Sequence, residues 1–107
     1  MSEFTDQLHE VFAGLGPVQV RRMFGGHGVF HDGLMIGLVA DSVLYLKADR
    51  ETIPRFADRG MEPFVYHKSG NPVRMSYYTA PEEIYEDADE ARHWADLALA
   101  AAVRSKR

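Results

Sequence analysis

The chain has 107 residues, of which 46% are hydrophobic and 26% charged, and 12 Lys and Arg against 16 Asp and Glu give a net charge of −4. A chain of this length and composition is typical of one soluble globular domain, so we expect a single stand-alone domain over residues 1–107, with no C-terminal domain after it. The net negative charge disfavours autonomous binding to nucleic-acid phosphates, and the absence of cysteine excludes disulfides and thiolate catalysis.

The chain begins with an amphipathic helical pattern. From Phe4 to Leu15 apolar residues recur at a spacing that places them on one helical face, and Pro17 follows where the helix must end. The next stretch, from Val18 to Phe24, changes to the alternation of apolar and polar residues that is typical of a strand. The start of the chain therefore predicts a helix followed by a strand.

Arg22 has an unusual position in this first strand. The alternation places it on the same face as Val20, and a buried arginine is seldom unpaired, so we expect it to meet a carboxylate, backbone carbonyls or a bound anion. The run Gly25-Gly26-His27-Gly28 follows, and its glycines permit backbone angles and close approaches that other residues do not. This run with Arg22 is a candidate binding surface, in which His27 changes its charge near neutral pH. The alternative is a tight turn with a surface histidine.

Further strand patterns follow the glycine run. Asp32-Gly33 lies between apolar residues, a pattern that predicts a hairpin. Leu34–Val39 is apolar enough for a central strand, and Val43–Ala48 alternates, with Tyr45 and Lys47 on one of its faces. We therefore expect a sheet with an antiparallel arrangement.

The second half of the chain predicts a short helix, a hairpin and a long helix. The short helix covers Glu51–Arg59, and the two strands of the hairpin are Phe64–His67 and Val73–Tyr78. After a helical turn that starts at Pro81-Glu82-Glu83, the last helix carries a stripe of small apolar residues with Trp94 as its anchor, which we expect to be buried against the sheet. The expected fold class is α+β, in the order α-β-β-β-α-β-β-α, with an antiparallel sheet and helices mainly on one face.

Four short motifs resemble, in their order, the TfoX N-terminal-domain family, whose characterised members are competence regulators of the TfoX/Sxy type. These motifs are Arg22-Met23-Phe24-Gly25-Gly26, Leu44-Tyr45-Leu46-Lys47, Gly60-Met61-Glu62-Pro63-Phe64, and Met75-Ser76-Tyr77-Tyr78 with Pro81-Glu82-Glu83. The resemblance covers nearly the whole chain. It implies the layout of the secretion-chaperone-like folds and a role in regulating bacterial competence for DNA uptake.

The sequence shows no pattern of an enzyme active site. The five histidines are scattered, the serines lack the context of a nucleophile elbow, and the glycine run lacks the spacing and lysine of a phosphate-binding loop. The acidic residues between Glu82 and Glu90 lie at two predicted helix starts, where they complement the helix dipole. We therefore expect no catalytic, cofactor-binding or metal-binding residues, no cofactor, and a protein that is not an enzyme.

The resemblance favours a regulatory or protein-interaction module linked to the transcriptional regulation of competence. The expected contact surface consists of Arg22, Gly25, Gly26, His27, Gly28, Tyr45, Lys47, Arg74 and Tyr78, because tyrosine and arginine are favoured at interfaces. The alternatives are a half-solvated sheet face without a partner, DNA binding together with a partner, and a small-ligand or anion-binding domain or enzyme that uses the Gly25–Gly28 run.

The expected partners follow from charge and from the exposed sheet. We expect an unidentified protein partner, a homodimer through a sheet face or edge, no membrane association and no direct binding to nucleic acid. The start of the chain lacks the basic and then apolar pattern of a signal peptide, and no apolar run is long enough to span a bilayer. These features predict a cytoplasmic protein.

Overall fold

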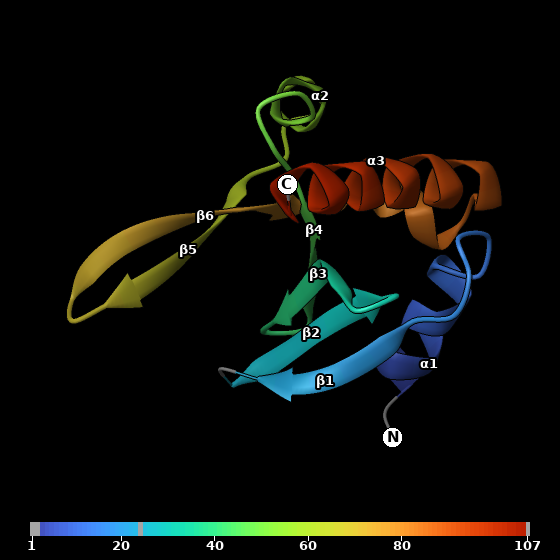
Figure 1. The fold of residues 1–107 in the computed structure, drawn as a ribbon, viewed down its shortest axis with the longest axis horizontal. Helices are drawn as coiled ribbons and strands as arrows, with labels where there is room; N and C mark the ends of the chain where they lie inside the picture. Colours follow the sequence, from blue (N-terminus) through green and yellow to red (C-terminus); the bar gives the residue numbers. More distant parts are fainter. Residues whose placement is uncertain (1–2, 24, 107) are drawn as a thin grey trace.

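A computed structural model describes residues 3–23 and 25–106 of the chain (Figure 1). Among these residues, the elements in chain order are α1 (Glu3–Val11), β1 (Gln19–Met23), β2 (Gly26–His31), β3 (Leu34–Ala40), β4 (Val43–Lys47), α2 (Ile53–Asp58), β5 (Pro63–Lys68), β6 (Asn71–Thr79), the 3-10 helix η1 (Glu82–Tyr85) and α3 (Ala88–Lys106).

The six strands form one antiparallel sheet in the order β1-β2-β3-β4-β6-β5, which confirms the α+β class. The expected order contained three strands before the second helix, whereas the structure has four. The difference arises at the glycine run, because Gly26, His27 and Gly28 belong to β2 and pair with β1 instead of forming a loop. Gly25 has a φ of 75°, which glycine tolerates better than other residues, and it lies in the turn before β2.

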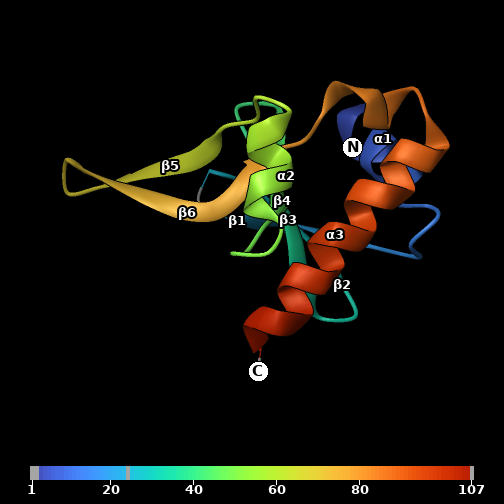
Figure 2. The ribbon, with the colours of Figure 1, turned by 90° about the horizontal axis from the view of Figure 1, so that it is seen from above.

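The core lies between one face of the sheet and the helices. α3 packs across β3 and β4, and α1 and η1 pack against α3 (Figure 1, Figure 2). Strand residues such as Val29 and Leu46 contribute to the core from the sheet, and Phe12 contributes from the turn that follows α1. Small residues along α3, among them Ala98, allow the helix to approach the sheet closely.

Trp94 is the largest side chain that α3 contributes to this core. It is 2% exposed, and its ring centroid lies 4.8 Å from that of Phe56 in α2. The expectation that Trp94 is buried is therefore confirmed, and its ring joins α2 to α3. Burial of an aromatic ring of this size is among the larger single contributions to a small domain.

The β5–β6 hairpin extends away from the helices as a two-stranded arm (Figure 1, Figure 2). Its turn consists of Ser69 and Gly70, with φ values of 53° and 82°, as in the two-residue turns that match the twist of a hairpin. Three large apolar side chains of the arm, Val65, Tyr66 and Val73, are more than 40% exposed. The arm is therefore much less covered than β3 and β4.

Candidate functional site: a groove on the open face of the sheet

The face of the sheet opposite the helices, here called the open face, holds a groove with a volume of about 330 Å³. Val39 and Leu44 pair with each other in the core, whereas the neighbouring pair Leu38 and Tyr45 points to the open face, because successive side chains of a strand alternate between faces. The groove is lined from the β1–β3 side by Met23, Gly26, Met35, Leu38, Val39 and Ala40, and from the β5–β6 arm by Phe64, Tyr66, Lys68, Met75 and Tyr77.

Glycines in β2 make room for the methionine side chains of the groove. A Cβ atom added at Gly28 would lie 2.5 Å from Met23 Sδ and 3.3 Å from Met35 Cε, too close for either side chain to keep its place. A Cβ atom at Gly26 would overlap the backbone carbonyl of Val39. Glycine at these two positions thus lets β2 approach β3 and lets two methionines cover the strand.

Aromatic side chains and one lysine lie beside the groove on the open face. The rings of Tyr45 and Phe64 meet edge to face, with centroids 5.0 Å apart. Lys47 Nζ donates a 2.8 Å hydrogen bond to Ser76 Oγ and lies 5.0 Å from the centre of the Tyr77 ring. Burial lowers the pKa of Lys47, with Asp49 acting in the opposite direction, and burial raises the pKa of Tyr77. Lys47 and Tyr77 thus form a partly desolvated contact at this surface.

Four of the residues expected at a contact surface do lie at or next to the groove. Gly26 lines it, Gly28 lies beneath Met23 and Met35, and Tyr45 and Lys47 contact its aromatic residues. The remaining expected residues lie elsewhere.

The expectation that Arg22 is buried and paired is wrong, because its side chain is exposed. Arg22 pairs with His27, and His27 pairs with Val39, whose side chain lies in the core. Arg22 therefore lies on the helix-facing side of the sheet, as the alternation predicts. Arg22 nevertheless sits near the end of edge strand β1, and the described residues offer it no hydrogen-bond or ion-pair partner. The partly buried His27 shares this face, so neither residue faces the groove.

Tyr78, Arg74 and Gly25 also lie outside the groove. Tyr78 was expected at a surface but is 9% exposed, because it pairs with Leu46 on the core face and packs against Phe56. Arg74 is exposed and pairs with Val65, on the face of the arm opposite Tyr66. Gly25 lies in the turn before β2, with open space where a side chain would be.

Most residues of the groove, including the three methionines and the arm residues Phe64 and Tyr66, are not among those expected at a contact surface. The alternation of Phe64, Tyr66 and Lys68 was available as a signal that these three side chains share a face. The alternation by itself does not show that this face of the arm lies across the groove from β1–β3. That arrangement depends on the curvature of the sheet, and the register is irregular at Val29/Phe30 and at Pro63/Val65, where a bulge would add bend and twist.

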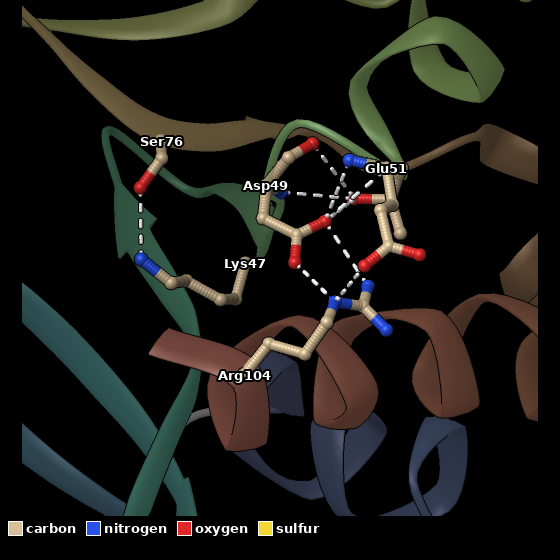
Figure 3. A network of polar contacts seen from close by, with 6 residues as sticks. Lys47, Asp49, Glu51, Ser76 and Arg104 are labelled. Atoms are coloured by element: carbon tan, nitrogen blue, oxygen red, sulfur yellow. Dashed lines mark hydrogen bonds and ion pairs between the residues drawn. The ribbon is translucent and has the colours of Figure 1, made fainter. Parts of the chain in front are cut away.

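A second polar cluster, shown in Figure 3, joins the end of α3 to the segment between β4 and α2. Arg104 donates two hydrogen bonds to Asp49, from Nε at 2.5 Å and from an Nη atom at 3.0 Å, and its Nε lies 3.0 Å from a Glu51 carboxylate oxygen. Asp49 also accepts bonds from the backbone N–H groups of Glu51 and Thr52. The hydrogen bonds from Arg104 lower the pKa of Asp49, and those same contacts raise the pKa of Arg104. Because its donors and acceptors are matched, this cluster fits a structural role.

Two further observations concern metal binding and membrane-spanning helices. Within residues 3–23 and 25–106, no three His, Asp or Glu side chains are grouped so that they could hold a metal ion. The helices of the same residues include none that is both long and apolar enough to cross a membrane.

The sequence of the chain matches one family model and two curated relatives. A model of the TfoX N-terminal domain matches residues 10–102. The chain is 32% identical over 82 residues to the DNA transformation protein TfoX1 of Aliivibrio fischeri, an alignment that covers 77% of this chain and 39% of the relative. It is 26% identical over 97 residues to the Protein Sxy of Escherichia coli, which covers 91% of this chain and 46% of the relative. The chain thus spans less than half the length of these curated relatives.

Proposed function

Because the chain belongs to the TfoX N-terminal domain family, we propose that it is a non-enzymatic regulatory module that binds a protein partner and contributes to the control of competence for DNA uptake. The name of the relative TfoX1, a DNA transformation protein, supports a role in competence. The proposal concerns the part of such a regulator that the chain spans, and assigns the groove on the open face as the contact surface.

The observation that carries the proposal is the composition of the groove. Methionine side chains are flexible and polarizable, so Met23, Met35 and Met75 can adapt their shape to a partner. The aromatic side chains Phe64 and Tyr66 offer large contact areas, a property enriched at protein interfaces. An apolar concave surface of this kind, on a sheet face without helices, is a natural place for a partner to dock.

The groove supports one alternative occupant. Its volume of about 330 Å³ lies at the lower end of the range of small-molecule pockets, and Lys68 supplies a cation. A small amphipathic anion is therefore the second candidate. Thermal denaturation with and without a medium-chain fatty acid distinguishes it from a protein partner, because a ligand that binds only the folded state raises the melting temperature.

A chimaera in Aliivibrio fischeri tests the protein-binding function. We expect that TfoX1 in which this domain replaces the matching segment supports transformation, and that Met75→Glu in the groove lowers the transformation frequency by about tenfold or more, because a buried contact would then contain an unpaired charge. Val103→Glu is the matched control, since Val103 is an exposed apolar residue of α3 outside the groove. Equal transformation by the two variants, at equal protein levels, would show that the groove is not the contact surface.

A further inference from the structure

Charge is divided unequally between the sheet and the rest of the molecule. All 16 acidic residues lie outside the six strands, although the strands contain five of the 12 lysines and arginines. These five are Arg21, Arg22, Lys47, Lys68 and Arg74. A chain with a net charge of −4 therefore has a sheet whose formal charges are all positive. A partner that pairs with a strand therefore meets formal charges on the strands that are opposite in sign to the net charge of the protein.

The groove reaches from one edge strand of the sheet to the other. β1 and β5 are the two edge strands, and each has a neighbour on one side only among the described residues. Met23 of β1 lines the groove, and so do Phe64, Tyr66 and Lys68 of β5. The N–H and C=O groups along the free edge of a strand can pair with another extended chain, so a partner strand on β5 would place alternate side chains beside this groove.

The exposed arm is suited to receive such a strand. Val65, Tyr66 and Val73 account for three of the five large apolar residues that are strongly exposed in the described part of the chain, and all three lie on β5 or β6. Val65 and Tyr66 are adjacent in β5 and therefore point to opposite faces, so both faces of the arm expose apolar surface. A two-stranded ribbon is marginal by itself, and a third strand adds backbone hydrogen bonds and buries apolar area.

We propose that β5 pairs with an extended segment of a partner protein, in which acidic side chains alternate with apolar ones. This inference rests on the proposed function and specifies the chemistry of the partner. The apolar side chains occupy the groove beside Tyr66 and the methionines. The acidic side chains alternate with them and therefore point to the opposite face of the arm, where the exposed Arg74 lies.

Two other occupants fit the same surface less well. Single-stranded nucleic acid requires exposed ring faces for stacking, but Tyr77 is only 7% exposed, and the rings of Tyr45 and Phe64 contact each other. A second copy of the chain would offer a strand without acidic residues, because none of the six described strands contains Asp or Glu. Neither occupant matches both the shape and the charge of the surface.

Fluorescence anisotropy with synthetic peptides tests the proposal on the full chain. The probe is a labelled peptide in which glutamate alternates with valine. One control replaces every glutamate by lysine, and another carries N-methyl groups on consecutive backbone amides, which keeps the side chains but removes N–H donors from both edges of the peptide. We expect the glutamate peptide to bind and both controls to bind at least about tenfold more weakly. Hydrogen exchange at β5 amides should slow when the glutamate peptide is bound.

Protein variants locate the contact. Arg74→Glu should weaken binding of the glutamate peptide by about five- to tenfold, since an attraction becomes a repulsion. Arg55→Glu makes the same charge change at an exposed position of α2 outside the groove and should leave binding unchanged. Circular dichroism and melting of both variants verify that the fold is retained.

Several results would overturn the proposal. Absence of binding by the glutamate peptide, equal binding of the lysine or N-methyl peptide, or tighter binding of oligothymidylate would each exclude an acidic partner strand on β5. Concentration-dependent dimers in analytical ultracentrifugation that the glutamate peptide does not dissociate would identify a second copy as the occupant instead. If the peptide fails to bind but Met75→Glu still impairs the chimaera, the protein-binding function stands and only this mode of binding is wrong.

Discussion

Gly28 shows how one residue can serve both the fold and a binding surface. It lies inside β2, and its missing side chain leaves the space that Met23 and Met35 occupy on the open face. A glycine in a strand usually weakens it, because no side chain packs against the neighbours. Here the neighbouring methionines fill that space, and they also provide the adaptable part of the groove. The glycines of β2 therefore have a packing role that differs from the turn suggested by their clustering.

Asp49 gives a prediction about pH at the residue scale. Hydrogen bonds from Arg104 lower the pKa of Asp49 in the folded protein. A carboxylate with a lowered folded pKa contributes stability above its unfolded pKa, and this contribution is lost as the pH falls through the folded pKa. We expect Asp49→Asn to lower the free energy of unfolding at pH 7 by about 1–3 kcal/mol. The difference in the free energy of unfolding between wild type and Asp49→Asn should shrink below about pH 4, where Asp49 becomes protonated in the unfolded chain.

Urea unfolding at several pH values measures this difference. Asp58→Asn is the matched control, since Asp58 is an exposed carboxylate at the end of α2 for which the described residues provide no ion-pair partner. A difference between wild type and Asp49→Asn that stays constant down to pH 3 would show that the carboxylate of Asp49 does not act through its charge.

The elements of the fold differ in how they are stabilised. α3 lies across the centre of the sheet, where a stripe of alanines permits close contact and Trp94 fills the space towards α2. The β5–β6 arm has no such cover, and its two-residue turn and backbone pairing maintain the hairpin. We infer that the stability of the domain resides mainly in the contact of α3 with β3 and β4, while the arm is left available for binding.

Replacement of Trp94 by alanine tests whether the packing of α3 supplies most of the stability of the domain. We expect Trp94→Ala to lower the free energy of unfolding by about 3–5 kcal/mol, because it leaves a cavity between α2 and α3. For a small domain this is a large fraction of the total stability. Val103→Ala truncates an exposed residue of the same helix and should have little effect in thermal or chemical denaturation. A Trp94→Ala protein that melts like wild type would contradict the assignment of α3 as the main contact.

For the molecule as a whole, the separation of charge determines which partners can approach. Helices, turns and loops contain every acidic residue, whereas the strands contain only positive formal charges. The acidic regions oppose the long-range attraction that a polyanion would need, while the sheet retains a local preference for acidic groups. This arrangement favours a short acidic segment over an extended phosphate backbone. The homodimer expected from the exposed sheet edge stays a prediction.

We expect the isolated protein not to bind duplex DNA at physiological salt. The five positive charges of the strands are divided between the two faces of the sheet, since Arg22 and Lys47 lie on opposite sides, and they form no continuous stripe of phosphate contacts. A gel-shift titration at several salt concentrations measures the affinity. Binding in the nanomolar range with a steep dependence on salt would contradict this expectation.

Local patterns in the sequence were sufficient for the class of the fold and for most of its elements. The helical spacing in α1 and α3, the Asp32-Gly33 turn and the alternation in β4 depend on neighbours within a few residues, so each can be recognised without knowledge of the fold. The burial of Trp94 followed from the same kind of pattern. The family, too, was recognisable from short motifs in their order along the chain.

The groove, in contrast, depends on contacts between residues that are distant in the sequence. Tyr77 and Tyr78 are chemically alike, and only the pairing of Tyr78 with Leu46 places one ring in the core and the other beside the groove. Arg22 has the face that alternation assigns to it, yet it is exposed because the extent of helix cover is not encoded in the strand itself. Met23 and Tyr66 line the same groove from the two edge strands, so their meeting depends on the curvature of all six strands together.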